Sequence, residues 1–396
     1  MSEHRIRDFP VSLGYLRTGP KNSIADVPGV RVGHKTVNKG AIRTGVTVIM
    51  PGDDNPFINK YTAAAFVQNG FGKSVGLMQI EELGTLETPI ALTNTLNVGK
   101  VSDALNAYII EETKAKGTMA RSINPVVGEC NDSVLHDIQQ RCIGYDEVMD
   151  AINDVSEDFA QGDVGAGRST ICFGFKGGIG SASRVITVGQ NEGGTSSQSE
   201  DVETSYTIGV LVQSNFGATK DFVLNGESLG RWWMNQGQVN GGTQREGRGQ
   251  MTGTGQKAHR QSDDEWAYSE SDQGSIMVIV ATDLPVNSRQ LKRIIKRAGV
   301  GIMRTGAYVG HGSGEVMIGF TTANRVPHEG PLFNTQQIIR DSALNPAFLG
   351  VAEATYEAIL NSLVAAEGAM TQEGKRYESL CEVLNLYMSC ETDTNI

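Results

Sequence analysis

The residues best suited to do chemistry meet at one peptide bond, between Gly274 and Ser275. Before it runs a long polar stretch, and after it residues 275–281 form an apolar run typical of a buried strand. If this bond is cut, Ser275 gains a free α-amine beside its hydroxyl and so carries its own candidate base. The ordinary alternative is a loop that ends at a core strand, and the junction alone leaves both interpretations open.

Two more candidate groups lie on either side of this junction. Ser313 and Glu315 are two residues apart, so on an extended segment both side chains point to one face and could relay a proton. Asn215 follows an apolar run, where its amide could donate to a developing oxyanion. The alternatives are a solvated strand end for the pair and a turn residue before Gly217 for Asn215.

A polar cluster follows the apolar pair Val126 and Val127, in a pattern typical of a strand end that leads into a helix. Glu129 is a candidate anchor for the ammonium group of a substrate. Asn131 is a second candidate for substrate binding. Asp132 is expected to cap the following helix.

The glycine-rich stretches at residues 162–167 and 176–183 contain no Gly-Lys-Ser/Thr. That tripeptide occurs at residues 72–74, but Val67 stands where a phosphate-binding loop needs its first Gly. We therefore interpret these glycines as turn and close-packing residues and expect no nucleotide site.

Composition excludes several other classes of function. A net charge of -11 and a pI near 5.1 argue against nucleic-acid binding. The five cysteines have no CxxC spacing and the six histidines form no HExxH motif, so we expect reduced thiols and no metal site. The first residues lack the apolar core of a signal peptide, and no 18-residue apolar run follows, which predicts a cytoplasmic protein with no membrane segment.

The elements that must position these residues are strands mixed with long helices, which predicts a layered α/β sandwich. The predicted strands are residues 45–50, 90–92, 170–175, 207–212, 275–281 and 315–321. The predicted helices are residues 101–113, 288–298 and 346–365. The second helix is expected to be capped by Asn287 or Ser288 and stopped by Gly299, and the third is apolar on one side.

The segment from about 235 to 274 differs from the rest in composition, and we expect a mobile, exposed loop there. The strands of residues 275–396 would expose their edges unless they paired with the first part of the chain. A cut after Gly274 is therefore expected to yield two chains, 1–274 and 275–396, of one body rather than two domains.

Together these stretches resemble the DmpA family of self-processing aminopeptidases (peptidase family S58), which includes the L-aminopeptidase/D-Ala-esterase and the β-peptidyl aminopeptidases. The matching stretches appear in family order, which is more specific than any one motif: 24–34, 43–48, 128–132, 162–167, 176–180, 209–217, 274–275 and 312–315.

The resemblance implies a four-layer αββα sandwich that hydrolyses the N-terminal residue from short peptides, amides or esters without a cofactor, as a tetramer of processed heterodimers. It also implies cleavage at Gly274–Ser275 and roles for the candidates: Ser275 as nucleophile, Ser313 and Glu315 as its supporting pair, Asn215 as oxyanion donor and Glu129 as the receiver of the substrate amine. The chain departs from the family at Asn131, where some members have Tyr, and in a longer loop before the cut.

Several alternatives stay open at this stage. The base could be the Ser275 α-amine or the Ser313–Glu315 pair, and the preferred first residue could be an L-α-, D- or β-amino acid. The related ornithine acetyltransferase fold also cleaves itself, but at Thr, whereas this chain has Ser275. A non-catalytic, unprocessed scaffold of the same fold is the third possibility.

Overall fold

The computed structural model describes residues 4–189, 203–239 and 273–393. Two β-sheets form its centre. The first has four strands in the order β1 (Arg31–Lys39), β2 (Ile42–Met50), β5 (Ile90–Asn94) and β6 (Val126–Cys130). The second has six strands in the order β4 (Thr85–Leu86), β3 (Asn59–Gly70), β12 (Gly312–Pro327), β11 (Gln273–Thr282), β10 (Thr204–Asn215) and β9 (Ile179–Val188).

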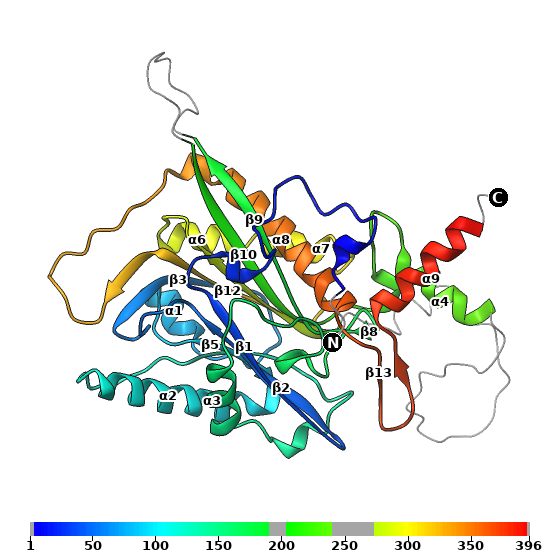
Figure 1. The fold of residues 1–396 in the computed structure, drawn as a ribbon, viewed down its shortest axis with the longest axis horizontal. Coiled ribbons are helices and arrows are strands. Elements are labelled where there is room, and N and C mark those ends of the chain that lie inside the picture. Colours follow the sequence, from blue (N-terminus) through cyan, green and yellow to red (C-terminus); the bar gives the residue numbers. More distant parts are fainter. Residues whose placement is uncertain (1–3, 190–202, 240–272, 394–396) are drawn as a thin grey trace, which may run out of the picture.

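Helices cover the outer face of each sheet (Figure 1). The four-stranded sheet packs against α2 (Val98–Ala115) and α3 (Tyr145–Asn153), and the six-stranded sheet packs against α6 (Ser288–Ile295), α7 (Ala298–Met303) and α8 (Asn345–Val364). The remaining helices are α1 (Leu77–Leu83), α4 (Leu229–Val239) and α9 (Leu380–Asp393), and the short strands are β7 (Ile171–Cys172), β8 (Phe175–Lys176), β13 (Ala369–Met370) and β14 (Arg376–Tyr377). The 3-10 turns are η1 (Ile6–Asp8), η2 (Ile24–Asp26), η3 (Thr95–Asn97), η4 (Ile138–Gln140), η5 (Gly165–Gly167), η6 (Thr219–Asp221) and η7 (Asp341–Leu344).

Three apolar clusters fill the three spaces between these layers. Val48 and Leu105 meet in the cluster between the four-stranded sheet and its helices. Leu92 and Ile279 belong to the cluster between the two sheets, and Val278 and Ile359 to the cluster under α6–α8. The predicted four-layer αββα sandwich is therefore confirmed.

Strand β11 lies inside the six-stranded sheet, where it pairs antiparallel with β10 and parallel with β12. Strand β12 in turn pairs with β3. The two long strands β11 and β12 thus complete their hydrogen bonding with strands from the part of the chain before Gly274. The residues before and after Gly274 therefore share one sheet and one core.

Local details differ from the prediction in four places. Residues 170–175 form no continuous strand: β7 and β8 are joined by a tight turn with positive φ at Phe173 (52°) and Gly174 (71°), the geometry of a type I′ hairpin. Gly299 stops no helix, because α6 ends at Ile295 and α7 runs through this glycine. Helix α8 is buried on all sides over residues 350–364, not on one side alone.

The fourth difference concerns the loop predicted from 235 to 274. Its first five residues are helical, since α4 continues to Val239, and residues 273 and 274 already belong to β11. Residues 240–272 lie outside the described part of the chain.

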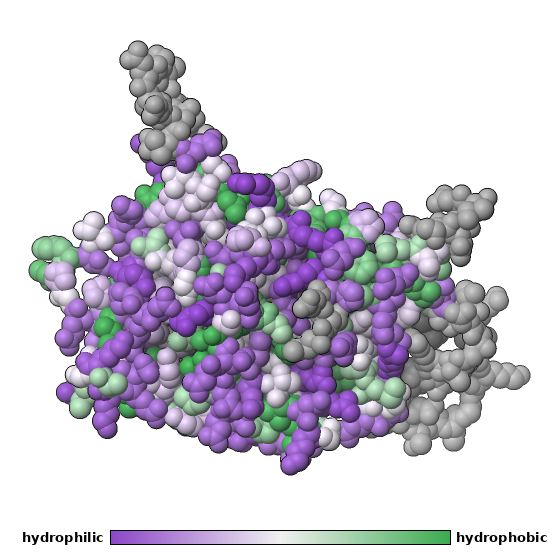
Figure 2. All heavy atoms as spheres, in the orientation of Figure 1, coloured by the Kyte–Doolittle hydropathy of each residue, from purple (hydrophilic) through white to green (hydrophobic). Residues whose placement is uncertain are grey.

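The outer surface is polar over most of the face seen in Figure 2, with apolar residues scattered among hydrophilic ones. Within the described ranges, no helix has both the length and the apolar character needed to cross a membrane.

Candidate active site

Ser275 lies near the start of β11, directly opposite Asn215 at the end of β10. Further along β11, Met277 belongs to the cluster between the sheets and Ile276 to the cluster under the helices. Because side chains alternate along a strand, Ser275 points with Met277 toward the four-stranded sheet. In β10, Leu211 and Asn215 are four residues apart and so point to the same face, and Leu211 belongs to the cluster between the sheets. Asn215 therefore lies on the same face as Ser275.

The amide of Asn215 is held in one orientation. Its Oδ1 accepts a hydrogen bond of 3.0 Å from the main-chain nitrogen of Ile171. The NH2 end of the amide is therefore the end that can donate to an oxyanion formed at Ser275.

Gly274 has a backbone conformation that only glycine tolerates well. Its φ is +121°, and a Cβ at this position would lie 1.9 Å from the carbonyl oxygen of Asn215. Residues with a side chain rarely adopt this φ, and the close approach of β10 leaves no room for one. The position before Ser275 therefore requires glycine, and it lies beside the candidate oxyanion donor.

Ser313 and Glu315 do form a pair, since the Ser313 hydroxyl donates to Oε1 of Glu315. Both are buried, and Ser313 lies directly opposite Gly274 in the parallel pairing of β11 with β12. Residues 313, 315 and 317 alternate along β12 and so point to the same face, and Met317 belongs to the cluster under the helices. The pair therefore lies beside the Gly274–Ser275 peptide, but on the sheet face opposite the Ser275 side chain.

Glu129 is the penultimate residue of β6 and is buried. Its carboxylate accepts from the main-chain nitrogen of Lys73 at 2.8 Å and from the hydroxyl of Thr95. The segment of Phe71 to Lys73, which binds Glu129 through Lys73 N, also packs against Gly314, the residue opposite Ser275 in β12. A Cβ on Gly314 would lie 2.5 Å from the carbonyl oxygen of Phe71. Glu129 and Ser275 thus belong to one region, with Gly314 between them.

The structure also places Asn131 and Asp132, the other two candidates on this segment. Asn131 is exposed, and its side-chain oxygen accepts from the main-chain nitrogen of Ser133 at 3.0 Å, so it shapes the turn after β6. Asp132 caps no helix. It is buried, accepts from the Thr44 hydroxyl at 2.5 Å and from Asn94 at 3.4 Å, and burial raises its pKa to about 7.

Comparison with known proteins shows where this arrangement belongs. The chain matches peptidase family S58 over residues 22–377. It belongs to this family. The β-peptidyl aminopeptidase BapA of Sphingosinicella xenopeptidilytica is 34% identical over 380 residues, which cover 92% of this chain and 85% of that protein.

Two solved structures of aminopeptidases have the same fold. A β-aminopeptidase from Burkholderia sp. superposes with a TM-score of 0.79 at 33% identity, covering 96% of this chain and 98% of the other. The L-aminopeptidase D-Ala-esterase/amidase of Ochrobactrum anthropi, described as a prototype of the serine aminopeptidases and a variant of the Ntn hydrolase fold, gives 0.79 at 30% identity, covering 97% and 98%.

The predicted family resemblance is thereby confirmed. The chain is a serine aminopeptidase, a hydrolase of peptide bonds with the Ntn hydrolase fold. Neither the acyl-transferase alternative nor the non-catalytic scaffold is favoured by these comparisons.

Sequence reasoning missed two buried groups that shape the site of this S58 peptidase. The thiol of Cys130 donates to the main-chain carbonyls of Ser275 at 3.5 Å and Gln213 at 3.4 Å, and burial raises its pKa, so it remains a protonated donor. The sequence showed Cys130 only as one of five cysteines without a recognisable spacing. It is the one that lies within the 128–132 motif.

Lys176 is the second. It is fully buried, and its ammonium group donates to the carbonyls of Gly167 (3.0 Å), Thr170 (3.0 Å) and Gly177 (2.6 Å). Burial lowers its pKa to about 7. These bonds fix the turn that ends at Ile171, which orients Asn215. The only sequence signal was a lysine in front of the glycines at 177 and 178.

Proposed function

We propose that this serine aminopeptidase first cuts its own Gly274–Ser275 bond and then uses Ser275 to release the N-terminal residue of short peptides, amides or esters. The conformation of Gly274 is the observation that supports self-cleavage most directly. A positive φ of +121° and the lack of room for a Cβ beside Asn215 restrict this position to glycine, so no side chain shields the carbonyl that would be attacked.

In the precursor, the Ser275 hydroxyl attacks the Gly274 carbonyl carbon, and the amide of Asn215 stabilises the oxyanion. The bond between the Gly274 carbon and the Ser275 nitrogen then breaks as that nitrogen takes up a proton, which leaves an ester on the Ser275 oxygen. Water hydrolyses this ester to a Gly274 carboxylate and a free Ser275 hydroxyl. The new α-amine and the hydroxyl are now on one residue.

In the mature enzyme the α-amine is the base that we assign. Such an amine has a pKa of about 7.7–8.0, so an appreciable fraction is neutral near pH 7 and can take the hydroxyl proton. Ser313 lies opposite Gly274, on the other face from the Ser275 side chain. The Ser313–Glu315 pair is therefore better placed to bind the amine than to deprotonate the hydroxyl itself.

Glu129 supplies the substrate's anchor. A buried carboxylate that already accepts from Lys73 N and Thr95 can also pair with an ammonium group. With the substrate's amine at Glu129, its first carbonyl faces Ser275. An acyl-enzyme forms, the shortened peptide or amine leaves, and water releases the amino acid.

After cleavage the two chains are expected to stay together, because β11 and β12 pair with β10 and β3 of the other chain. Assembly into a tetramer of such heterodimers and a cytoplasmic location are further predictions. Light scattering coupled to size-exclusion chromatography tests the assembly.

Denaturing gel electrophoresis of the purified protein tests the central step. The wild type should give two fragments that meet at 274/275, by mass and by N-terminal sequencing, whereas Ser275→Ala should give one full-length, inactive chain. Ser275→Cys is the matched control, since it retains a nucleophile and should still be processed, at a reduced rate. Normal two-band processing of Ser275→Ala would remove Ser275 as the nucleophile.

A further inference from the structure

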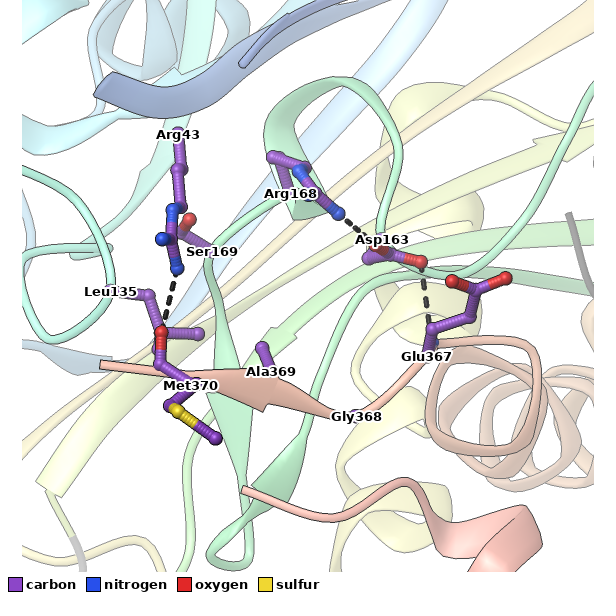
Figure 3. A pocket seen from close by; sticks show the side chains of 9 residues that line it. All are labelled: Arg43, Leu135, Asp163, Arg168, Ser169, Glu367, Gly368, Ala369 and Met370. Atoms are coloured by element: carbon purple, nitrogen blue, oxygen red, sulfur yellow. Dashed lines mark hydrogen bonds and ion pairs between the residues drawn. The ribbon is translucent and has the colours of Figure 1, made fainter. Parts of the chain in front are cut away.

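A cavity of about 190 Å³ opens beside the turn that holds Asn215 (Figure 3). Arg43 from β2, Leu135 from the turn after β6, Arg168 and Ser169 from the segment before β7, and Met370 from β13 line it. Elements that lie far apart in the sequence thus contribute charged and polar side chains to one small space.

The cavity has one cation that is not neutralised. Arg168 pairs with Asp163 through its Nη1. Arg43 donates through Nη1 to the main-chain carbonyl of Met370 at 2.6 Å, and among the described residues no carboxylate forms an ion pair with it. The carboxylate of Glu367 belongs to an exposed residue on the far side of the cavity from Arg43 (Figure 3). The part of the cavity next to Arg43 therefore favours an anion.

Two buried polar atoms in the cavity wall have no hydrogen-bond partner within the described chain: Oγ of Ser169 and Nε of Arg168. Ser169 is 1% exposed. Buried donors of this kind are normally satisfied, and leaving them unpaired costs stability. A carboxylate, which accepts from a hydroxyl and from guanidinium groups at once, would satisfy both.

The position of the cavity relative to Ser275 is set by β10 and β12, which flank β11 on opposite sides. Glu129 lies on the β12 side, through the segment that touches Gly314. The cavity lies on the β10 side: Ser169 is two residues from Ile171, whose nitrogen binds Asn215, and two residues span at most about 7 Å. A peptide with its amine at Glu129 and its first carbonyl at Ser275 would extend toward the cavity.

We propose that this cavity is a subsite for the leaving group, which binds the C-terminal carboxylate of a dipeptide or tripeptide substrate. Arg43 supplies the charge, and Ser169 and Nε of Arg168 donate hydrogen bonds. The assignment rests on the function proposed above and narrows its substrates to short peptides with a free C-terminus.

The wild-type enzyme tests the subsite through matched pairs of dipeptides, each as the free acid and as the C-terminal amide. We expect a KM for the acid roughly tenfold lower, because hydrogen bonds to charged groups are stronger than those to neutral ones. Equal KM values for acid and amide would overturn the subsite and leave the aminopeptidase function intact. Failure to cleave either substrate would instead count against the proposed function.

Arg43→Met then tests the residue. It should raise KM for the free acid roughly tenfold while changing KM for the amide much less, and Ser169→Ala should act in the same direction with a smaller effect. Arg121→Met is the matched control, since Arg121 is exposed and precedes β6 at the end opposite Glu129, so its acid-to-amide ratio should equal that of the wild type. An equal loss on acid and amide in Arg43→Met would show a structural role only and would refute the carboxylate contact.

Discussion

The two faces of the six-stranded sheet differ sharply at the start of β11. On the face toward the other sheet, Ser275 and Asn215 stand side by side, and the Cys130 thiol binds the Ser275 carbonyl. On the face toward the helices, Ser313 and Glu315 bind each other opposite Gly274. The Gly274–Ser275 peptide thus has the proposed nucleophile and oxyanion donor on one side and an acid–hydroxyl pair on the other.

The difference extends into the two cores. Under α8, fully buried Arg184 binds Glu353 at 3.0 Å and Glu357 at 2.8 Å, so charge is paired with charge. Between the sheets, the half-buried imidazole ring of His34 hydrogen-bonds to neutral groups, the Thr47 hydroxyl at 2.9 Å and the Ala160 carbonyl at 3.1 Å. The helix layer thus holds buried ions in pairs, whereas burial keeps this histidine between the sheets neutral.

The largest effect is expected from the nucleophile's own face. Asn215→Ala removes the oxyanion donor and should lower kcat by about 10²–10³-fold, with slower self-processing as well. Steady-state kinetics on an aminoacyl amide and a gel time course measure both. Asn153→Ala, at an exposed position on α3, is the control. Unchanged kcat in Asn215→Ala would place the oxyanion donor elsewhere.

On β6 of the facing sheet, Glu129→Gln removes the charge, while its amide oxygen can still accept from Lys73 N and its NH2 can donate to the Thr95 hydroxyl. KM for substrates with a free amine should rise about tenfold or more, since a charge-assisted bond becomes a neutral one. Ester substrates that lack the amine provide the comparison. If both classes lose the same factor, Glu129 does not bind the amine.

The opposite face is tested by Glu315→Gln. If the pair orients the Ser275 amine, removing the carboxylate lowers the pKa of that amine, and the acid limb of the kcat/KM profile moves to lower pH by about one unit. If the pair is itself the proton acceptor, activity should instead fall by about 10²–10⁴-fold at every pH. The pH–rate profile of the processed variant separates these results.

The smallest effect at neutral pH is expected from His34, where burial lowers the pKa to about 4. Between pH 6.5 and 4 the unfolded chain binds a proton that the native state does not, so stability falls as the pH falls. This group should cost about 2 kcal/mol of unfolding free energy between pH 7 and 5, and His34→Asn should remove that dependence. Urea unfolding at both pH values measures it. An equal loss in wild type and variant would show that other groups cause it.

Much of the fold could be predicted because it follows from local patterns. Alternating and apolar runs located β2, β5, β10, β11 and β12, and the 3.6-residue period located α2, α6 and α8. The hairpin at Phe173–Gly174 was missed because both residues adopt positive φ within an apolar run. Gly299 was misassigned because it lies inside α7, where it packs closely against the Gln68 side chain of β3 instead of ending a helix.

The sequence by itself determined the family, the layered sandwich and the Gly274–Ser275 junction, because these depend on residue type, order and spacing along the chain. Tertiary structure alone decided which face each candidate occupies, since strand register is a long-range property. It also decided that Lys176 and Cys130 are buried beside the site, that Asp132 caps no helix, and that Arg43 and Ser169 meet in one cavity. Burial and neighbours, which no local pattern encodes, set the chemistry of these groups.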